Sequence, residues 1–170
     1  MAGAGLVALQ GNSYRYCSLW SEESTWGYLF PPVDGESVAV PDHLCLLVDI
    51  QNTPKLKLVQ VDGGALIFPS NDADPTYEAT FDAHYIMINN GTMEVGTEKH
   101  PYKSKLTITM YGEKYDPAMP IFGKKSIGVS FGTLDIHGVH KTSWTELDAT
   151  VQPEDNSLTV VEEVDWEEGD

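Results

Sequence analysis

Apolar and polar residues alternate along three segments of this chain, and a glycine interrupts each alternation at the same place. The segments cover residues 58–68, 85–95 and 126–136. Because side chains in a strand point to opposite faces in turn, each alternating run predicts a β-strand with one apolar face. Glycine has no Cβ and therefore allows the chain to bend between the two strands of each segment.

The apolar positions of the three segments correspond to one another. Those on one face are Val59/Val61, Ile86/Ile88 and Ile127/Val129 before the glycine, and Leu66/Phe68, Met93/Val95 and Leu134/Ile136 after it. A unit this short cannot bury its apolar face alone, whereas stacked copies share one core. The pattern predicts an all-β fold, specifically a short right-handed parallel β-solenoid (β-helix-like) with a small N-terminal helical turn.

The helical turn is expected within residues 18–26. Ser21 or Ser24 would cap it, and Trp20 and Trp26 would fold onto the core.

The later part of the chain gives less regular signals. Residues 112–122 contain two prolines and two aromatic residues, which predicts a long irregular excursion. Long loops on a rigid scaffold commonly carry contacts. Trp144 is expected in the core, and residues 158–161 are expected to form a final strand.

The net charge limits the classes of partner. Ten Lys and Arg residues stand against 26 Asp and Glu residues, a formal net charge of −16 in 170 residues. Such a surface repels phosphate backbones, so we expect no nucleic-acid partner. An acidic glycan would require a local basic patch. Lys114, Tyr115, Lys124 and Lys125, in and beside the excursion, are the candidate contact for a glycan or another partner.

Cys17 and Cys45 are the two cysteines of the chain. They form either one disulfide or two buried thiols, and an extracellular location favours the disulfide. Asn90-Gly91-Thr92 is an N-glycosylation sequon placed at an expected corner, where a glycan would project.

Several groups of polar residues invite a chemical interpretation, and none is specific. His137 and His140 with Asp135 suggest a metal site, but two histidines three apart on a strand point to opposite faces. Asp72, Asp74 and Asp82 do not follow a standard calcium-loop spacing. No catalytic residue, metal or cofactor is therefore assigned.

A series of short motifs resembles the G8 domain family, a glycine-marked β module of extracellular proteins that includes the fibrocystin-like proteins. The motifs, in order, are Trp26, Pro31-Pro32-x-x-Gly35, Gly64-x-Leu66-x-Phe68, Ile88-x-x-Gly91, Gly96-Thr97-Glu98-x-x-Pro101-Tyr102 and Gly132-x-Leu134-Asp135-Ile136-His137-Gly138. The resemblance implies a structural role for His137.

The resemblance also implies a domain organisation. Residues 1–16 lie outside the resemblance: they have no clear period and lack the length and basic flank of a signal peptide, so the residues themselves predict a linker or an expression leader. Residues 17–150 would form the G8 domain. Residues 151–170 would begin a further β-solenoid rung that is cut short.

The function implied is a non-catalytic extracellular module of a large membrane-tethered surface protein, giving structural support and contact with a glycan or protein. It would lie at the extracellular face of the plasma membrane or be secreted, and would meet the membrane only through the longer protein. Related G8 domains belong to hyaluronan-binding and hyaluronan-depolymerising proteins, so part of such a glycoside-cleaving protein is one alternative. A homophilic coat or adhesion module that self-associates is another.

Overall fold

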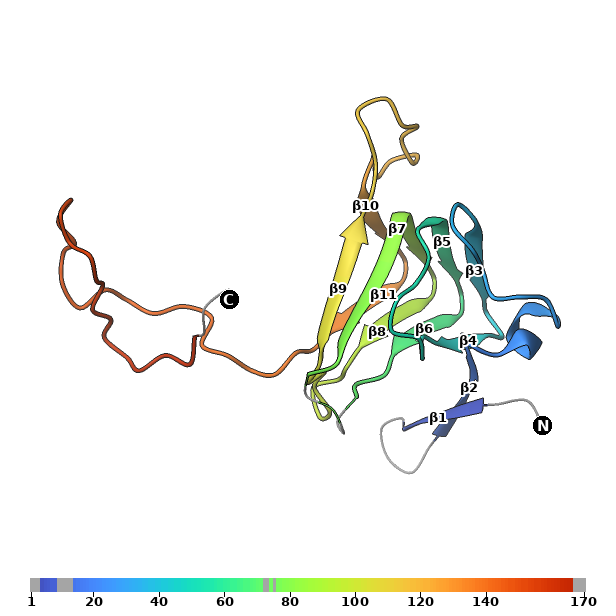
Figure 1. Cartoon of the computed structure of the whole chain (residues 1–170), viewed down its shortest axis with the longest axis horizontal. Helices are drawn as coiled ribbons and strands as arrows, with labels where there is room; N and C mark the ends of the chain where they lie inside the picture. The colour runs from blue at the N-terminus through green and yellow to red at the C-terminus, as the bar shows by residue number, and fades with distance from the viewer. Residues whose placement is uncertain (1–3, 9–13, 72–73, 75, 167–170) are drawn as a thin grey trace. The chain divides into compact units, whose positions relative to one another are not determined.

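Strands joined by glycine corners form two sheets in the computed structural model, which describes residues 4–8, 14–71, 74 and 76–166 (Figure 1). The first sheet has the order β1-β2-β4-β6-β8-β11. Its strands are Ala4–Ala8, Tyr14–Leu19, Cys45–Leu47, Ala65–Phe68, Thr92–Val95 and Thr133–Ile136. Every pairing in it is parallel except β1 with β2, which is antiparallel.

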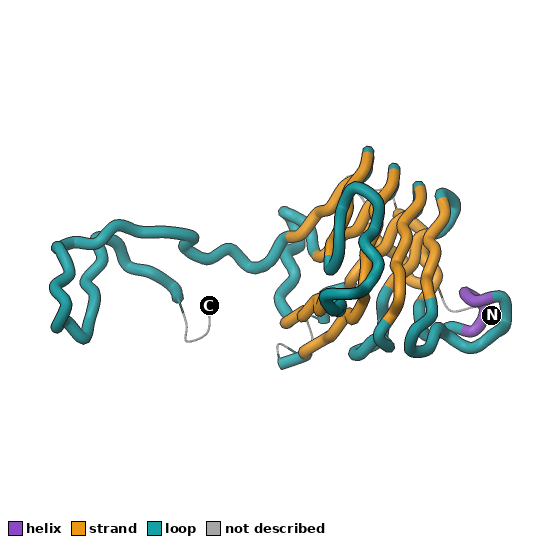
Figure 2. The backbone as a smooth tube through the Cα atoms, turned by 90° about the horizontal axis from the view of Figure 1, so that it is seen from above, coloured by secondary structure: helices purple, strands orange, loops and turns teal. Residues whose placement is uncertain are grey.

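The second sheet is parallel throughout and has the order β10-β7-β5-β3, with β9 also paired to β7. Its strands are β3 Ser37–Pro41, β5 Leu56–Asp62, β7 Glu78–Asn89, β9 Lys105–Met110 and β10 Ser126–Ser130. Seen from above, the strands of the two sheets form neighbouring rows (Figure 2). The all-β class and the parallel pairing expected from the sequence are confirmed.

The three repeats lie in register with one another. In the second sheet Val59 pairs with Ile86 and Ile86 with Ile127. In the first sheet Leu66 pairs with Met93 and Met93 with Leu134. The corresponding apolar positions predicted from the alternation therefore stack directly on each other, and in the first two repeats they form the buried core between the sheets.

The glycine corners leave no room for a side chain, because the backbone of each corner lies directly against backbone atoms of another segment. A Cβ on Gly64 would lie 2.3 Å from the carbonyl oxygen of Pro41, and one on Gly91 would lie 2.8 Å from that of Gly64. The positive φ angles fall one residue earlier, at Gly63, Asn90 and Phe131. From the sequence alone, the glycine at the second position of each corner was explained by the freedom of the backbone to bend. That explanation was incomplete, because close packing against neighbouring backbone atoms is what excludes a side chain at this position.

A disulfide joins Cys17 of β2 to Cys45 of β4, with a Cα–Cα distance of 4.5 Å. Of the two alternatives for these cysteines, the structure contains the bonded one. Both residues are buried with Ala65 and Ile67 in a small apolar cluster separate from the main core. The bond thus cross-links two neighbouring strands of the first sheet.

A 3₁₀ turn, η1, spans Glu23–Trp26, within the segment predicted to be helical. Trp20 is fully buried, and the ring of Trp26 packs edge-on against it at 5.2 Å, as expected. The predicted capping is wrong, because Glu22 holds the N-cap position without a side-chain hydrogen bond. Ser21 instead donates its hydroxyl to Asp49 at 2.6 Å, which fixes the turn to the chain after β4.

Residues 4–8, inside the predicted linker, form β1. The antiparallel pairing of this segment with β2 is what makes it a strand.

Residues 139–170 form a second compact unit, distinct from residues 1–138. Its described part contains one isolated bridge, between Leu147 and Val160, and no strand, so the strand expected at residues 158–161 is wrong. Trp144 is 70% exposed, so its expected place in the core is wrong as well. The strand was expected from the local pattern alone, although a strand also needs a partner. Trp144 was expected in the core only because of its residue type. No helix in the described chain is long and apolar enough to cross a membrane.

Replacing Gly64 with alanine should lower the free energy of unfolding by about 1–3 kcal/mol, because the new Cβ meets three backbone carbonyl oxygens that cannot rotate away. Denaturant titration followed by the fluorescence of the buried Trp20 would measure the loss. Gly138→Ala is the matched control, since a Cβ there has no neighbour within 4 Å. Equal destabilisation by both substitutions would show that the close approach at Gly64 is unimportant.

Candidate functional site

A loop of the second sheet carries the basic residues singled out in the sequence. The first half of β7 pairs with β9 and its second half pairs with β10, so the chain must leave the sheet between these two strands. Residues 111–125 make this excursion (Figure 1). Its prolines and glycines prevent it from continuing as a regular strand.

The excursion is held onto the face of the second sheet that points away from the core. The hydroxyl of Tyr85, on β7, donates a hydrogen bond to the carbonyl oxygen of Pro117. The ring of Phe122 lies on Gly128 of β10, where a Cβ would come within 2.6 Å of it. These contacts fix the base of the loop on a rigid strand pair.

Three of the four predicted contact residues come together on this loop. The ammonium group of Lys124 donates to the carbonyl oxygen of Lys114 at 2.5 Å. The ammonium group of Lys114 lies 5.6 Å from the ring centroid of Tyr115, which is 87% exposed. Lys125 is exposed, and its side chain passes beside Gly112. The resulting surface, Lys114, Tyr115 and Lys124, is called the lysine loop below.

A polar and aromatic cluster at the base of the loop was missed by the sequence analysis. The ammonium group of Lys55 lies 3.9 Å from the ring centroid of Tyr111, whose hydroxyl is 3.4 Å from a carboxylate oxygen of Asp82. The His84 ring lies 6.2 Å from Tyr111, and its Nδ1 is 4.0 Å from Asp116. Desolvation, and then the charge of Asp82, raises the pKa of the Tyr111 hydroxyl. Lys55 precedes β5, Asp82 and His84 lie on β7, and Tyr111 follows β9. Only the pairing of these three strands brings the residues together, and the sequence does not specify that pairing.

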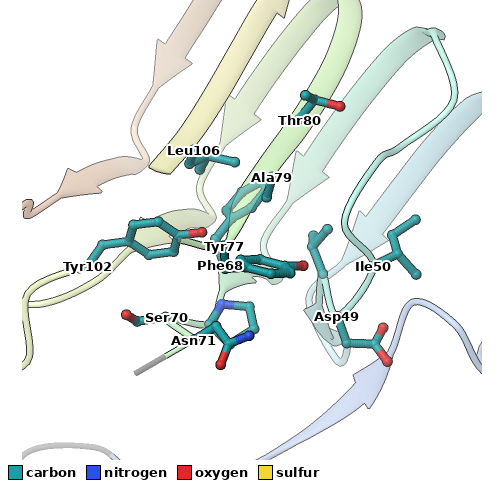
Figure 3. A pocket seen from close by; sticks show the side chains of 12 residues that line it. Asp49, Ile50, Phe68, Ser70, Asn71, Tyr77, Ala79, Thr80, Tyr102 and Leu106 are labelled. Atoms are coloured by element: carbon teal, nitrogen blue, oxygen red, sulfur yellow. The ribbon is translucent and has the colours of Figure 1, made fainter. Parts of the chain in front are cut away.

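A pocket of about 280 Å³ opens on the side of the sheets opposite the glycine corners (Figure 3). Its walls combine aromatic rings, among them Phe68, Tyr77 and Tyr102, with the polar side chains of Asp49 and Asn71. Burial, and then the neighbouring Tyr77, raises the pKa of the Tyr102 hydroxyl.

A second hollow, of about 300 Å³, follows the glycine corners and is lined by Arg15, Asp42, His43 and Asn90, among others. Asn90 is exposed and has a φ of 51°, so the sequon lies on an accessible corner.

Acidic groups crowd the outer face of the first sheet. Glu94 and Asp135 are direct partners on β8 and β11, and Asp135 pairs with Nε2 of His137 at 2.7 Å. Burial and then Asp135 raise the pKa of Glu94, while Arg15 and His137 act in the opposite direction. The backbone N–H of His137 also donates to Val95, and its carbonyl accepts from Tyr102, in line with a structural role.

In the part of the chain that the structure describes, the fold does not bring together the side chains of the two metal sites suggested by the sequence. Within residues 4–8, 14–71, 74 and 76–166, no three His, Cys, Asp or Glu side chains gather so that they could hold a metal ion. Asp74 accepts hydrogen bonds from Thr76, Asp82 lies beside Tyr111, and Asp72 is outside the described residues. His140 belongs to the second unit and His137 to the first.

Comparison with known proteins gives a family match over most of the chain. The sequence profile of the G8 domain matches residues 25–148. Fibrocystin-L of Mus musculus is 34% identical over 167 residues, which cover 98% of this chain and 4% of the relative. Fibrocystin of Mus musculus is 37% identical over 164 residues, 95% of this chain and 4% of the relative. The chain thus spans 4% of the length of these curated relatives.

A shorter match is to a protein that is named as a hyaluronidase. The cell surface hyaluronidase CEMIP2 of Homo sapiens is 47% identical over 96 residues, which cover 55% of this chain and 7% of the relative.

The ionisation of Glu94 should make the protein less stable as the pH rises. Its native pKa lies above that of the unfolded chain, so between the two values the native state binds more protons and the free energy of unfolding falls with increasing pH. Glu94→Gln should therefore be more stable than the wild type at pH 7 by a few tenths to about 1 kcal/mol. The difference should vanish in acid, below the ordinary glutamate pKa.

Urea titrations at several pH values would test this pH dependence. The exposed Glu98, substituted as Glu98→Gln, is the control and should show no such trend. A Glu94→Gln difference that does not change with pH would contradict the electrostatic explanation.

Proposed function

Because this chain belongs to the G8 domain family, we propose that it serves as a non-catalytic module of a large extracellular surface protein. The module contributes structural support and presents a contact for a glycan or a protein partner. The observation that carries the proposal is the lysine loop, a cationic and aromatic surface fixed onto a rigid parallel sheet in an otherwise acidic chain. Loops of this kind on stable scaffolds are common binding sites.

The electrostatic argument favours an anionic or polar glycan over nucleic acid. Lys114 and Lys124 add positive charge locally, but Glu113 and Asp116 lie in the same loop and a net charge of −16 surrounds it. This local charge can orient a weakly charged polymer, whereas a phosphate backbone would be repelled by most of the surface. Contact with a membrane would occur only through the longer protein, and the module would be extracellular or at the cell surface.

The proposal extends to the way the repeats wind. Within the predicted domain of residues 17–150, the strands up to Ile136 would form the coils of a short right-handed parallel β-solenoid. The alternation of the chain between two parallel sheets and the shared register of the repeats support this arrangement. An experimental structure in which successive repeats wind in opposite senses would contradict it.

Two alternatives have observations in their favour. The match to a cell surface hyaluronidase raises glycoside cleavage, with this chain holding part of the site. Self-association is favoured by the last repeat, where Val129 is 39% exposed and Leu134 38% exposed. Their counterparts in the two preceding repeats are fully buried.

Incubation with high-molecular-weight hyaluronan, with and without Ca²⁺, should give retention of the polymer without shortening. Retention would be measured by co-sedimentation and polymer length by gel electrophoresis. The Lys114→Gln/Lys124→Gln variant should bind about three- to tenfold more weakly, because it removes two charges from the lysine loop. Shortened polymer would instead establish catalysis.

A charge-matched control separates the loop from the net charge. Lys99→Gln/Lys105→Gln removes the same charge from exposed positions outside the lysine loop and should bind as the wild type does. Equal weakening by both double variants would overturn a specific contact at the loop. If nothing is retained and apparent size rises with concentration in sedimentation velocity, self-association becomes the better account.

Expression through a secretory pathway should attach one N-glycan at Asn90, because this exposed corner leaves the sequon accessible. Thr92→Val should remove the glycan and Thr92→Ser should keep it, while both preserve the backbone hydrogen bond from residue 92 to Gly64. Intact-mass measurement before and after treatment with a peptide N-glycosidase distinguishes the two variants. An unmodified wild-type protein would show that the sequon is unused.

A further inference from the structure

The two sides of the sheets are built differently, and an aromatic-lined pocket lies on the side with the longer passages. Passages from the second sheet to the first at the three repeats use two residues each, at 63–64, 90–91 and 131–132. Passages from the first sheet back to the second are longer and cover residues 48–55, 69–77 and 96–104. The pocket of about 280 Å³ lies on this second side (Figure 3).

The pocket walls suit a ligand with both flat apolar faces and polar edges. Phe68, Tyr77 and Tyr102 supply aromatic surface, and Leu106 and Ile50 add aliphatic surface. A pyranose ring presents C–H groups on its faces and hydroxyl groups around its edge. Such a mixture of ring walls and a few placed polar groups is typical of small-molecule sites.

The hydroxyl of Tyr102 is the polar group of the pocket that is best placed to meet a ligand. Its side chain is only 6% exposed, and its hydroxyl points towards the middle of the pocket (Figure 3). Among the residues that the structure describes, none accepts a hydrogen bond from this hydroxyl. Because this hydroxyl points into the pocket and no described residue accepts from it, it is available to a ligand hydroxyl, which would pair with it in place of water.

Two further polar groups at the pocket are held in place by the protein. The backbone N–H of Asn71 donates to the hydroxyl of Ser104 at 3.2 Å, while its side-chain amide has no partner in the described part of the chain. Asp49 accepts hydrogen bonds from the backbone and hydroxyl of Ser21 at 2.9 and 2.6 Å. The free Asn71 amide offers a donor and an acceptor on an anchored backbone, and the Asp49 carboxylate, held by Ser21, offers further acceptors.

The charge and size of the pocket narrow the class of ligand. Asp49 is the charged residue among the described lining residues, so a sugar carboxylate or sulfate would be repelled. The volume is just below the range of about 300–1,000 Å³ seen for drug-sized ligands, which suits a single ring and not a chain.

We propose that this pocket binds one uncharged sugar ring of a glycan, with the Tyr102 hydroxyl and the Asn71 amide pairing with ring hydroxyls. The site is separate from the lysine loop, which joins the end of β9 to the start of β10 and suits an anionic polymer. A negative result for binding at one site therefore does not affect the proposal for the other site.

The test uses the whole chain and the methyl glycosides of glucose, galactose, mannose and N-acetylglucosamine, with methyl glucuronide as the charged comparison. Chemical-shift titration should give a Kd of about 1–10 mM for at least one neutral glycoside, as expected for a ligand of about twelve non-hydrogen atoms. The glucuronide should bind more weakly.

Tyr102→Phe keeps the ring and removes the hydroxyl, so it should weaken binding about tenfold. Because no described residue pairs with that hydroxyl, the variant should unfold at the same denaturant concentration as the wild type. Tyr115→Phe, in the lysine loop, is the matched control and should bind the glycoside normally. Lys114→Gln/Lys124→Gln should also retain glycoside binding, whatever its effect on hyaluronan.

Three results would overturn the proposal. They are the absence of binding by all four neutral glycosides at about 50 mM, binding of the glucuronide as strong as that of the neutral ring, and unchanged affinity in a folded Tyr102→Phe variant.

Discussion

The close approach of backbone atoms at the glycine corners is the constraint on which the rest of this structure depends. Gly64 lies against the carbonyl oxygens of residues 40, 41 and 44, and Gly91 and Gly132 each lie against the corner glycine of the repeat before. The N–H of Thr92 bonds to Gly64, and the N–H of Thr133 bonds to Gly91. Because each corner sits directly on its predecessor, the strands on both sides of it are held in the same register. That register is what places apolar side chains of successive repeats on top of one another in the core.

The tight corners also decide where binding surfaces can form. The two-residue corners border a hollow lined in part by Asn90, whereas the longer passages on the opposite side line the pocket that contains Tyr102. The lysine loop has a different origin, since β9 and β10 share β7 as a partner and the chain between them must leave the sheet. A regular stack thus carries irregular segments at defined places, which is how a rigid scaffold presents variable contacts.

The sequence predicted what depends on local pattern and failed where distant partners decide. The alternation in residues 58–68, 85–95 and 126–136 sufficed for the strands, their corners and the packing of the first two repeats. The helical turn near Trp26 followed from residue type, but its capping did not, because Ser21 bonds to Asp49 instead. The cluster of Lys55, His84 and Tyr111 could not be foreseen, since its members meet only through the pairing of three strands. The pairing of Cys17 with Cys45 stayed open for the same reason.

The exposed core positions of the last repeat bear on both the proposed structural support and the alternative of self-association. Val129, Leu134 and Ile136 occupy core positions yet remain exposed, so the surface beside β10 and β11 is suited to be covered by further parallel strands with a matching corner. Two copies related by a two-fold axis would bring β11 against β11 antiparallel, which breaks the register that the glycines impose. Stacking head to tail would require a free parallel edge at β2, but β1 already covers that edge in antiparallel pairing. A further repeat of the same kind satisfies both sheets at once, and this favours a module that works within a longer stack.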